Sequence, residues 1–85
     1  MSLRLRADVS TTDTEYGAVL LDERSGDYWQ LNPTGALILV RLLAGDDPAQ
    51  AAAALAAEYD VDEARALLDV TALLEGLRSA RLVTS

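Results

Sequence analysis

The chain has 85 residues, of which 51% are hydrophobic and 25% are charged, and its formal net charge is −7. This size and composition predict one globular domain over residues 1–85, and the acidic surface argues against nucleic acid as a partner because it repels phosphate backbones. The sequence contains no His, Cys or Lys, so the common catalytic bases, nucleophiles and soft metal ligands are missing, and we expect no catalysis, metal or cofactor.

The first part of the sequence predicts three strands. Residues 3–9 alternate apolar and polar side chains, which is the pattern of a half-buried strand, and the polar residues 10–15 predict a loop. Residues 16–22 form an apolar run of strand length, the turn ERSG ends at Gly26, and residues 27–31 form a third short strand. The short turn between the last two strands predicts an antiparallel hairpin.

Three helices are predicted to follow the strands. The Asn-Pro pair at 32–33 combines a capping side chain with a proline at the first helical position, and this helix ends near residue 45. The Asp-Pro pair at 47–48 repeats the signal before an alanine-rich segment, and a third helix covers 63–80 with an extended tail. This order predicts an α+β fold, similar to winged helix-turn-helix domains, with a three-stranded antiparallel sheet followed by three helices.

No segment of the sequence has the pattern of a membrane span or of a secretory signal. No apolar run approaches the roughly 18 residues of a membrane span. Residues 1–10 lack the apolar stretch of a secretory signal. Together with the absence of Cys, these features predict a cytoplasmic protein.

Two alternative function classes find little support in the sequence. A DNA-reading third helix would need a basic face, but this segment mixes the acidic residues Glu63, Asp69 and Glu75 with Arg65, Arg78 and Arg81. A phosphopantetheine carrier protein would need a serine at a helix start. The candidates Ser10, Ser25 and Ser79 have no such context.

The third helix carries an apolar stripe of ordinary width. It is formed by Ala66, Leu67, Val70, Leu73, Leu74 and Leu77. Leu68 falls outside this stripe, near the polar side of the helix. Two interpretations remain open: the whole stripe is core and Leu68 a surface leucine, or one flank of the stripe lines a groove beside the sheet.

The third strand places two aromatic residues next to each other, so their side chains point to opposite faces. Leu31 precedes the first helix and is expected inside, which puts Trp29 beneath or beside the helices. Tyr28 and Gln30 then point outward.

In a simple meander the third strand is also a sheet edge. It has no Lys, no internal Pro and no obvious bulge, so it lacks the usual protection against pairing with another strand. Such an edge can accept an extended peptide through backbone hydrogen bonds. The alternatives are that residues 10–15 cover it, or that the edge is too short to matter.

The succession VLLDERSGDYWQLNPTGALILVRLLAG, a helix ending in AAEYDVD, and DVTALLEGLRSARLV resembles the PqqD-like proteins. These are recognition elements of ribosomally synthesised and post-translationally modified peptides (RiPPs). The similarity runs from about Tyr16 to Val83. Its motifs are G-x-Y-x-x-L-N at the hairpin exit, a D-V between the second and third helices, and a closing L-x-x-L-x-x-x-x-L-V. A chain of this size is most similar to the stand-alone leader-binding subunit of lasso peptide biosynthesis.

The resemblance implies a bacterial, non-catalytic adaptor with a winged-helix-like fold. A precursor's leader segment would add as a strand to the third strand, and its apolar side chains would settle against the third helix. The implied partners are the leader peptide, a separate leader peptidase and an ATP-dependent cyclase. Mapped by position, the implied peptide-binding residues are Asp27, Tyr28, Trp29, Gln30 and Leu31 on the strand, Leu67, Val70, Leu73, Leu74 and Leu77 on the helix, and Asp69 and Arg78 as a polar rim.

Within the same family, a pyrroloquinoline quinone peptide chaperone or an adaptor of another RiPP pathway remains an alternative. A winged-helix DNA-binding regulator is the alternative outside it, and the net charge argues against it.

Overall fold

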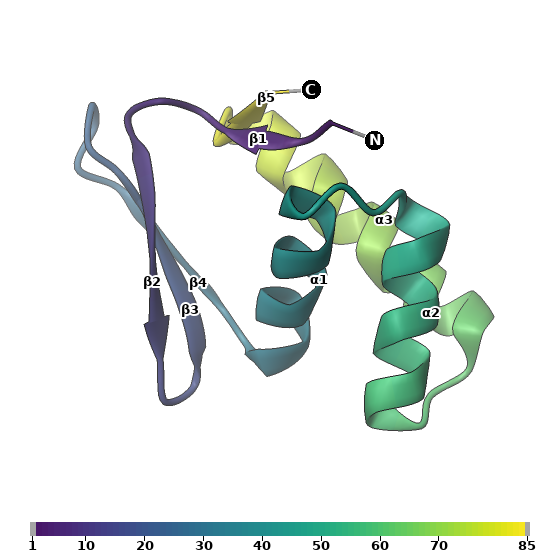
Figure 1. Cartoon of the computed structure of the whole chain (residues 1–85). Coiled ribbons are helices and arrows are strands. Elements are labelled where there is room, and N and C mark those ends of the chain that lie inside the picture. The colour runs from purple at the N-terminus through teal and green to yellow at the C-terminus, as the bar shows by residue number, and fades with distance from the viewer. Residues whose placement is uncertain (1, 85) are drawn as a thin grey trace.

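The computed structural model describes residues 2–84, and Figure 1 shows a small sheet standing beside three packed helices, with α1 nearest the sheet. The predicted α+β fold is confirmed: β2, β3 and β4 form a three-stranded antiparallel sheet in that order, and three helices follow. The elements are β1 (Arg4–Leu5), β2 (Val9–Thr14), β3 (Gly17–Asp22), β4 (Tyr28–Leu31), α1 (Pro33–Leu43), α2 (Pro48–Tyr59), α3 (Glu63–Ser79) and β5 (Val83–Thr84).

The prediction of the first strand was wrong. Residues 3–9 do not form one strand, because the chain turns after β1, where the backbone N–H of Val9 donates to the carbonyl of Arg6 at 2.9 Å. Most of the predicted loop 10–15 belongs to β2 instead. β2 is an edge strand, and every residue after Val9 is exposed. Its polarity therefore resembles that of a loop. The predicted extended tail forms β5, which pairs with β1.

The helix starts lie where the capping residues predict them. A side-chain oxygen accepts a hydrogen bond from the backbone N–H three residues further on, at 2.8 Å for Asn32 and Asp47 and at 3.3 Å for Asp62. Each cap satisfies an amide that has no partner within the helix. These short-range bonds fix where α1, α2 and α3 begin, and α1 follows β4 almost directly.

The core lies between the inner face of the sheet and the three helices. Alternate residues of β3 and β4 face it, and each helix contributes one stripe, which is the layered arrangement that small domains need. The buried residues are Leu3, Val9, Ala18, Leu20, Leu31, Ile38, Leu39, Leu42, Ala51, Ala52, Leu55, Ala66, Val70, Leu74, Leu77, Leu82 and Val83.

A network of ion pairs holds the sheet at the end away from the start of α1. Arg6 Nε lies 2.6 Å from Asp8 Oδ1, Arg6 Nη2 lies 2.7 Å from Asp22 Oδ2, and Arg24 Nε lies 3.0 Å from Asp8 Oδ2. Arg6 also donates to the carbonyl of Arg81 near the end of the chain. Hydrogen bonding to the Arg6 guanidinium holds the pKa of both carboxyls, Asp8 and Asp22, below the usual range.

Candidate functional site

The free edge of β4 is the first component of the candidate site. β4 pairs with β3 from Leu21–Tyr28 to Ala18–Leu31, and within residues 2–84 no strand pairs with its other side. The polar segment that could have covered this edge is β2, which lies on the opposite side of β3. The predicted open edge is therefore present in the described part of the chain.

The hairpin geometry decides which backbone groups of β4 face outward. The N–H of Asp22 donates to the carbonyl of Asp27 at 2.8 Å, so the carbonyl of Asp27 points toward β3. Because backbone groups alternate in direction along a strand, those of Trp29 and Leu31 also point toward β3. The N–H and C=O groups of Tyr28 and Gln30 then point away from the sheet, where they can pair with an added strand.

The side chains of β4 alternate between the two faces as predicted. Leu31 is buried beneath the helices, whereas Tyr28 and Gln30 are exposed on the outer face. Trp29 is 38% exposed, and its ring lies against α3 at Gly76, where an added Cβ would come within 3.7 Å of a ring carbon. The absence of a side chain at Gly76 makes room for the ring.

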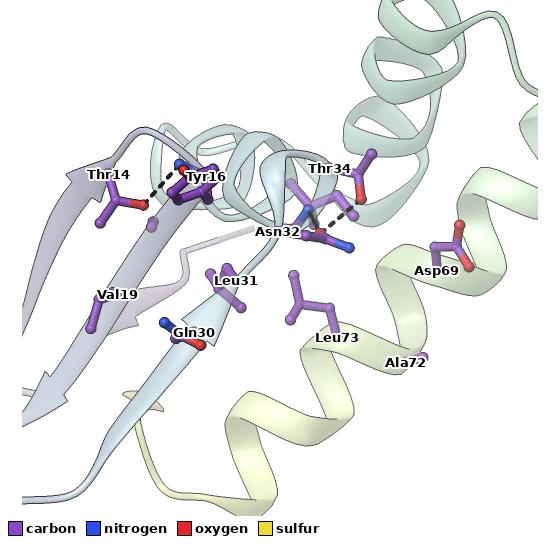
Figure 2. A pocket seen from close by; sticks show the side chains of 13 residues that line it. Thr14, Tyr16, Val19, Gln30, Leu31, Asn32, Thr34, Asp69, Ala72 and Leu73 are labelled. Carbon is purple, nitrogen blue, oxygen red and sulfur yellow. Dashed lines mark hydrogen bonds between the residues drawn. The ribbon is translucent and has the colours of Figure 1, made fainter.

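An apolar groove of about 810 Å³ adjoins β4, with α3 as its opposite wall (Figure 2). The β2–β3 turn and the start of α1 close one end of it. Figure 2 shows Leu31 on β4 and Leu73 on α3 on opposite sides of the groove. The lining residues are Thr14, Tyr16, Ala18, Val19, Gln30, Leu31, Asn32, Thr34, Gly35, Ile38, Asp69, Ala72 and Leu73.

Four of the residues implied by the resemblance line this groove: Gln30, Leu31, Asp69 and Leu73. Leu73 is half-buried and sits at one flank of the apolar stripe of α3. This position favours the second of the two interpretations, in which a flank of the stripe lines a groove. Leu68 is 67% exposed and lies outside the groove, as its place on the helix predicts.

The other implied residues are not among the groove-lining side chains. On α3, Val70, Leu74 and Leu77 are buried in the core behind the groove, and Leu67 is partly exposed outside it. On the strand side, Asp27 precedes β4, while Tyr28 and Trp29 flank the groove without lining it. Arg78 is exposed in the last turn of α3.

The residues implied by the resemblance do not include the closed end of the groove, which is formed by the β2–β3 turn and the first turns of α1. Gly17 brings them together: it has a φ of +138°, and an added Cβ would lie 2.0 Å from the carbonyl oxygen of Leu31. Only glycine fits there, so the turn can lie directly against the junction of β4 and α1. In the sequence, Gly17 is one position of the apolar run 16–22, and no local pattern shows that it lies against the backbone of Leu31.

The groove carries little charge. Asp69 is the one charged residue among its lining side chains, and its Oδ1 lies 3.7 Å from Arg65 Nε on the same helix. Within residues 2–84 no group of three or more carboxylates is placed to hold a metal ion. The site combines outward backbone groups along β4 with apolar side chains in the groove.

These features define a small α+β domain with an open sheet edge beside an apolar groove, a combination suited to an extended peptide. The profile of the family described as "Coenzyme PQQ synthesis protein D (PqqD)" matches residues 17–83. The chain belongs to the PqqD family, and the resemblance seen in its sequence is confirmed.

Two solved structures share this fold. "Lasso peptide synthetase B1 complexed with the leader peptide" is 46% identical, covers 100% of both chains and has a TM-score of 0.91. "TbiB1 in Complex with the TbiA(beta) Leader Peptide" is 27% identical, covers 96% of this chain and 95% of the other, and has a TM-score of 0.85. Among curated proteins no match was found. None of the described helices combines the length and apolar character that a membrane span requires.

Proposed function

We propose that this protein is a non-catalytic adaptor that binds the leader segment of a ribosomal precursor peptide in lasso peptide biosynthesis. The observation that carries this proposal is the open β4 edge running beside an apolar groove. Support also comes from the 46% identical lasso peptide synthetase B1, which is complexed with a leader peptide and matches this chain over its whole length.

The leader pairs with β4 as an added strand. Tyr28 and Gln30 each present one outward N–H and one outward C=O group. Each backbone hydrogen bond contributes roughly 0.5–1.5 kcal/mol net, because a hydrogen bond to water is exchanged for a hydrogen bond to the leader backbone. Backbone pairing holds the leader in register but does not by itself give high affinity.

The groove supplies the remaining affinity. Leu73 is half-buried at the groove, and the core residues Leu31 and Ile38 form its floor, so an apolar side chain of the bound leader can pack there. Two buried apolar anchors add about 1.5–3 kcal/mol each, and ordering the leader costs about 2–5 kcal/mol. With four backbone bonds at about 0.5–1.5 kcal/mol each, the gross contribution is about 5–12 kcal/mol, and the apolar anchors supply about half of it.

The other implied residues support this site from outside the groove. Val70, Leu74 and Leu77 fix the position of the α3 wall from the core, and Trp29 sets the spacing between β4 and α3 through its contact with Gly76. We assign Asp27, Tyr28, Leu67 and Arg78 to its margin, where they meet the leader only if it extends beyond the groove.

Delivery of the bound leader to a peptidase is the second part of the proposed function. The outer face of the sheet is suited to this contact because it carries no charged side chain, in a chain that is 25% charged. By the strand register, this face consists of Ser10, Thr12, Thr14, Val19, Leu21, Tyr28 and Gln30. A leader strand added to β4 would extend this face, so a leader peptidase that docks on the face would contact both the adaptor and the leader. An ATP-dependent cyclase acts after this step.

A pyrroloquinoline quinone pathway is the second candidate, because the matching family profile carries that description. The two candidates share the binding site and differ in the leader that it accepts. Titration with leaders from both pathways separates them, since the cognate leader binds more tightly.

The proposal is tested by titrating the protein with a synthetic copy of the leader peptide from the 46% identical structure. Trp29 is the single tryptophan and lies beside the groove, so its fluorescence should change with one-to-one stoichiometry. Leu73→Glu should weaken binding at least tenfold, because it removes an apolar contact of about 1.5–3 kcal/mol and places a charge in the groove.

Leu68→Glu is the matched control, because it makes the same change on an exposed part of the same helix outside the groove. It should leave affinity unchanged. Equal losses from both variants would show that the groove is not the binding site. Val70 is unsuitable for this test because its side chain is 0% exposed and a charge there would disrupt folding.

A further inference from the structure

Asp69 stands at the end of the groove that lies near the start of α1. Figure 2 shows it on the turn of α3 that precedes Leu73, with Thr34 of α1 across the groove. It is the one charged side chain among the groove-lining residues, and the neighbouring α3 positions in the lining, Ala72 and Leu73, are apolar. The packing of the surrounding apolar residues does not require a carboxylate at this position.

The carboxylate of Asp69 is only weakly engaged within the protein. Its ion pair is with Arg65, four residues earlier on the same helix, at a distance of 3.7 Å between Oδ1 and Nε. The two side chains are 55% and 74% exposed, and the basic residue precedes the acidic one, which is the less favourable order along a helix. Such an exposed pair contributes little to stability, so Asp69 can exchange its partner at small cost.

We propose that Asp69 selects the leader by charge: it favours a Lys or Arg side chain at the leader position facing this end of the groove and disfavours Asp or Glu there. The inference rests on the proposed function and adds a specificity-determining residue to it. A basic side chain there would pair with Asp69, whereas an acidic one would face both Asp69 and a protein of net charge −7. Partial shielding by the apolar wall strengthens both effects relative to bulk water.

The test is a charge scan of the leader peptide from the 46% identical structure. Each residue of the synthetic peptide is replaced in turn by Arg and by Glu, and every peptide is titrated against the wild-type protein by calorimetry. At one position the Arg peptide should bind about threefold to tenfold more tightly than the Glu peptide, as expected for a partly exposed charge pair. The difference should shrink at high salt because exposed charges are screened.

Variants of the protein then identify the residue responsible. Asp69→Arg should reverse the preference at that position, and Asp69→Asn should abolish most of it. Glu75→Gln removes the same charge from an exposed site on the same helix outside the groove, and it should leave the preference intact. Arg65→Gln should strengthen binding of the Arg peptide, because it removes the competing cation.

The outcomes separate this inference from the proposed function. If the peptides bind but no position shows a charge preference that Asp69→Arg reverses, the charge-selecting role is wrong while the adaptor function stands. An equal effect of Asp69→Asn and Glu75→Gln also overturns the role, since it would reflect net charge alone. If none of the peptides binds the wild-type protein, both the adaptor function and this role are wrong.

Discussion

The two edges of the sheet differ in what lies beside them. β2 is a polar strand, exposed at every position after Val9, and within the described residues it pairs only with β3. β4 is shorter and equally open on its outer side, but it runs beside the apolar groove whose other wall is α3. Both edges offer unpaired backbone groups, and at the β4 edge the groove adds apolar burial.

This difference explains why an open edge alone does not make a binding site. Backbone bonds contribute little each after exchange with water, and ordering a flexible peptide costs several kcal/mol. A peptide on β2 would gain the bonds, but β3 and β4 would separate it from the groove. β2 also carries the charged Asp13 on the face that it shares with Ala18, and a charge on an edge strand opposes pairing.

The largest effect is expected from a proline on the binding edge. Gln30→Pro removes an outward N–H of β4 without removing a β3–β4 hydrogen bond, and its ring obstructs an added strand. Leader affinity should fall at least about a hundredfold, since pairing and groove contacts are lost together. The measurement is a calorimetric titration, with circular dichroism to confirm that the helices remain folded.

Thr11→Pro is the matched control on the other edge. Thr14 pairs with Gly17 across a two-residue turn, so by alternation the N–H of Thr11 also faces away from β3. This variant should bind the leader normally. A loss of affinity as large as that of Gln30→Pro would contradict the prediction that the leader binds at the β4 edge.

An intermediate effect is expected at the turn that closes the groove. Gly17→Ala places a Cβ against the Leu31 carbonyl and strains a backbone of positive φ, so it should lower the free energy of unfolding by about 2–4 kcal/mol. Gly26→Ala has a positive φ but no atom within 4 Å of the added Cβ, and should cost only about 1 kcal/mol. Urea unfolding compares them, and equal losses would show that the close approach at Gly17 is unimportant.

The smallest effect concerns acid pH and the ion pairs at the far end of the sheet. Because Asp8 and Asp22 have lowered pKa values in the folded state, their contribution is present above about pH 4 and is lost as pH falls through the folded values. Arg6→Gln should lower stability at neutral pH and flatten its decline in acid. Thermal unfolding across this range measures both, and an unchanged slope would show that Arg6 does not set these pKa values.

Much of the fold could be predicted from short-range patterns. The caps of the three helices act through hydrogen bonds spanning three residues, and the β3–β4 hairpin follows from two apolar runs around a short turn. The opposite orientations of Tyr28 and Trp29 follow from the alternation of side chains along a strand. β2 could not be recognised in this way, because an exposed edge strand lacks the apolar alternation that marks a strand.

The groove was only partly predictable for a related reason. Gln30 and Leu73 lie on elements identified from the sequence, but which face of α3 turns toward β4 depends on packing. Val70 and Leu73 belong to one apolar stripe, yet the first is fully buried and the second lines the groove. Periodicity finds the stripe, and only the position of the sheet divides it into core and groove.

Patterns among neighbouring residues were enough to establish the caps, the hairpin, the apolar stripe of α3 and a chemistry without His, Cys or Lys. Long-range packing fixed which strand has an open edge beside a groove, how Gly17 closes that groove against Leu31, and how Arg6 joins Asp8 and Asp22. The reason is physical: local patterns reflect bonds within a few residues, whereas a groove exists only after distant segments have packed together.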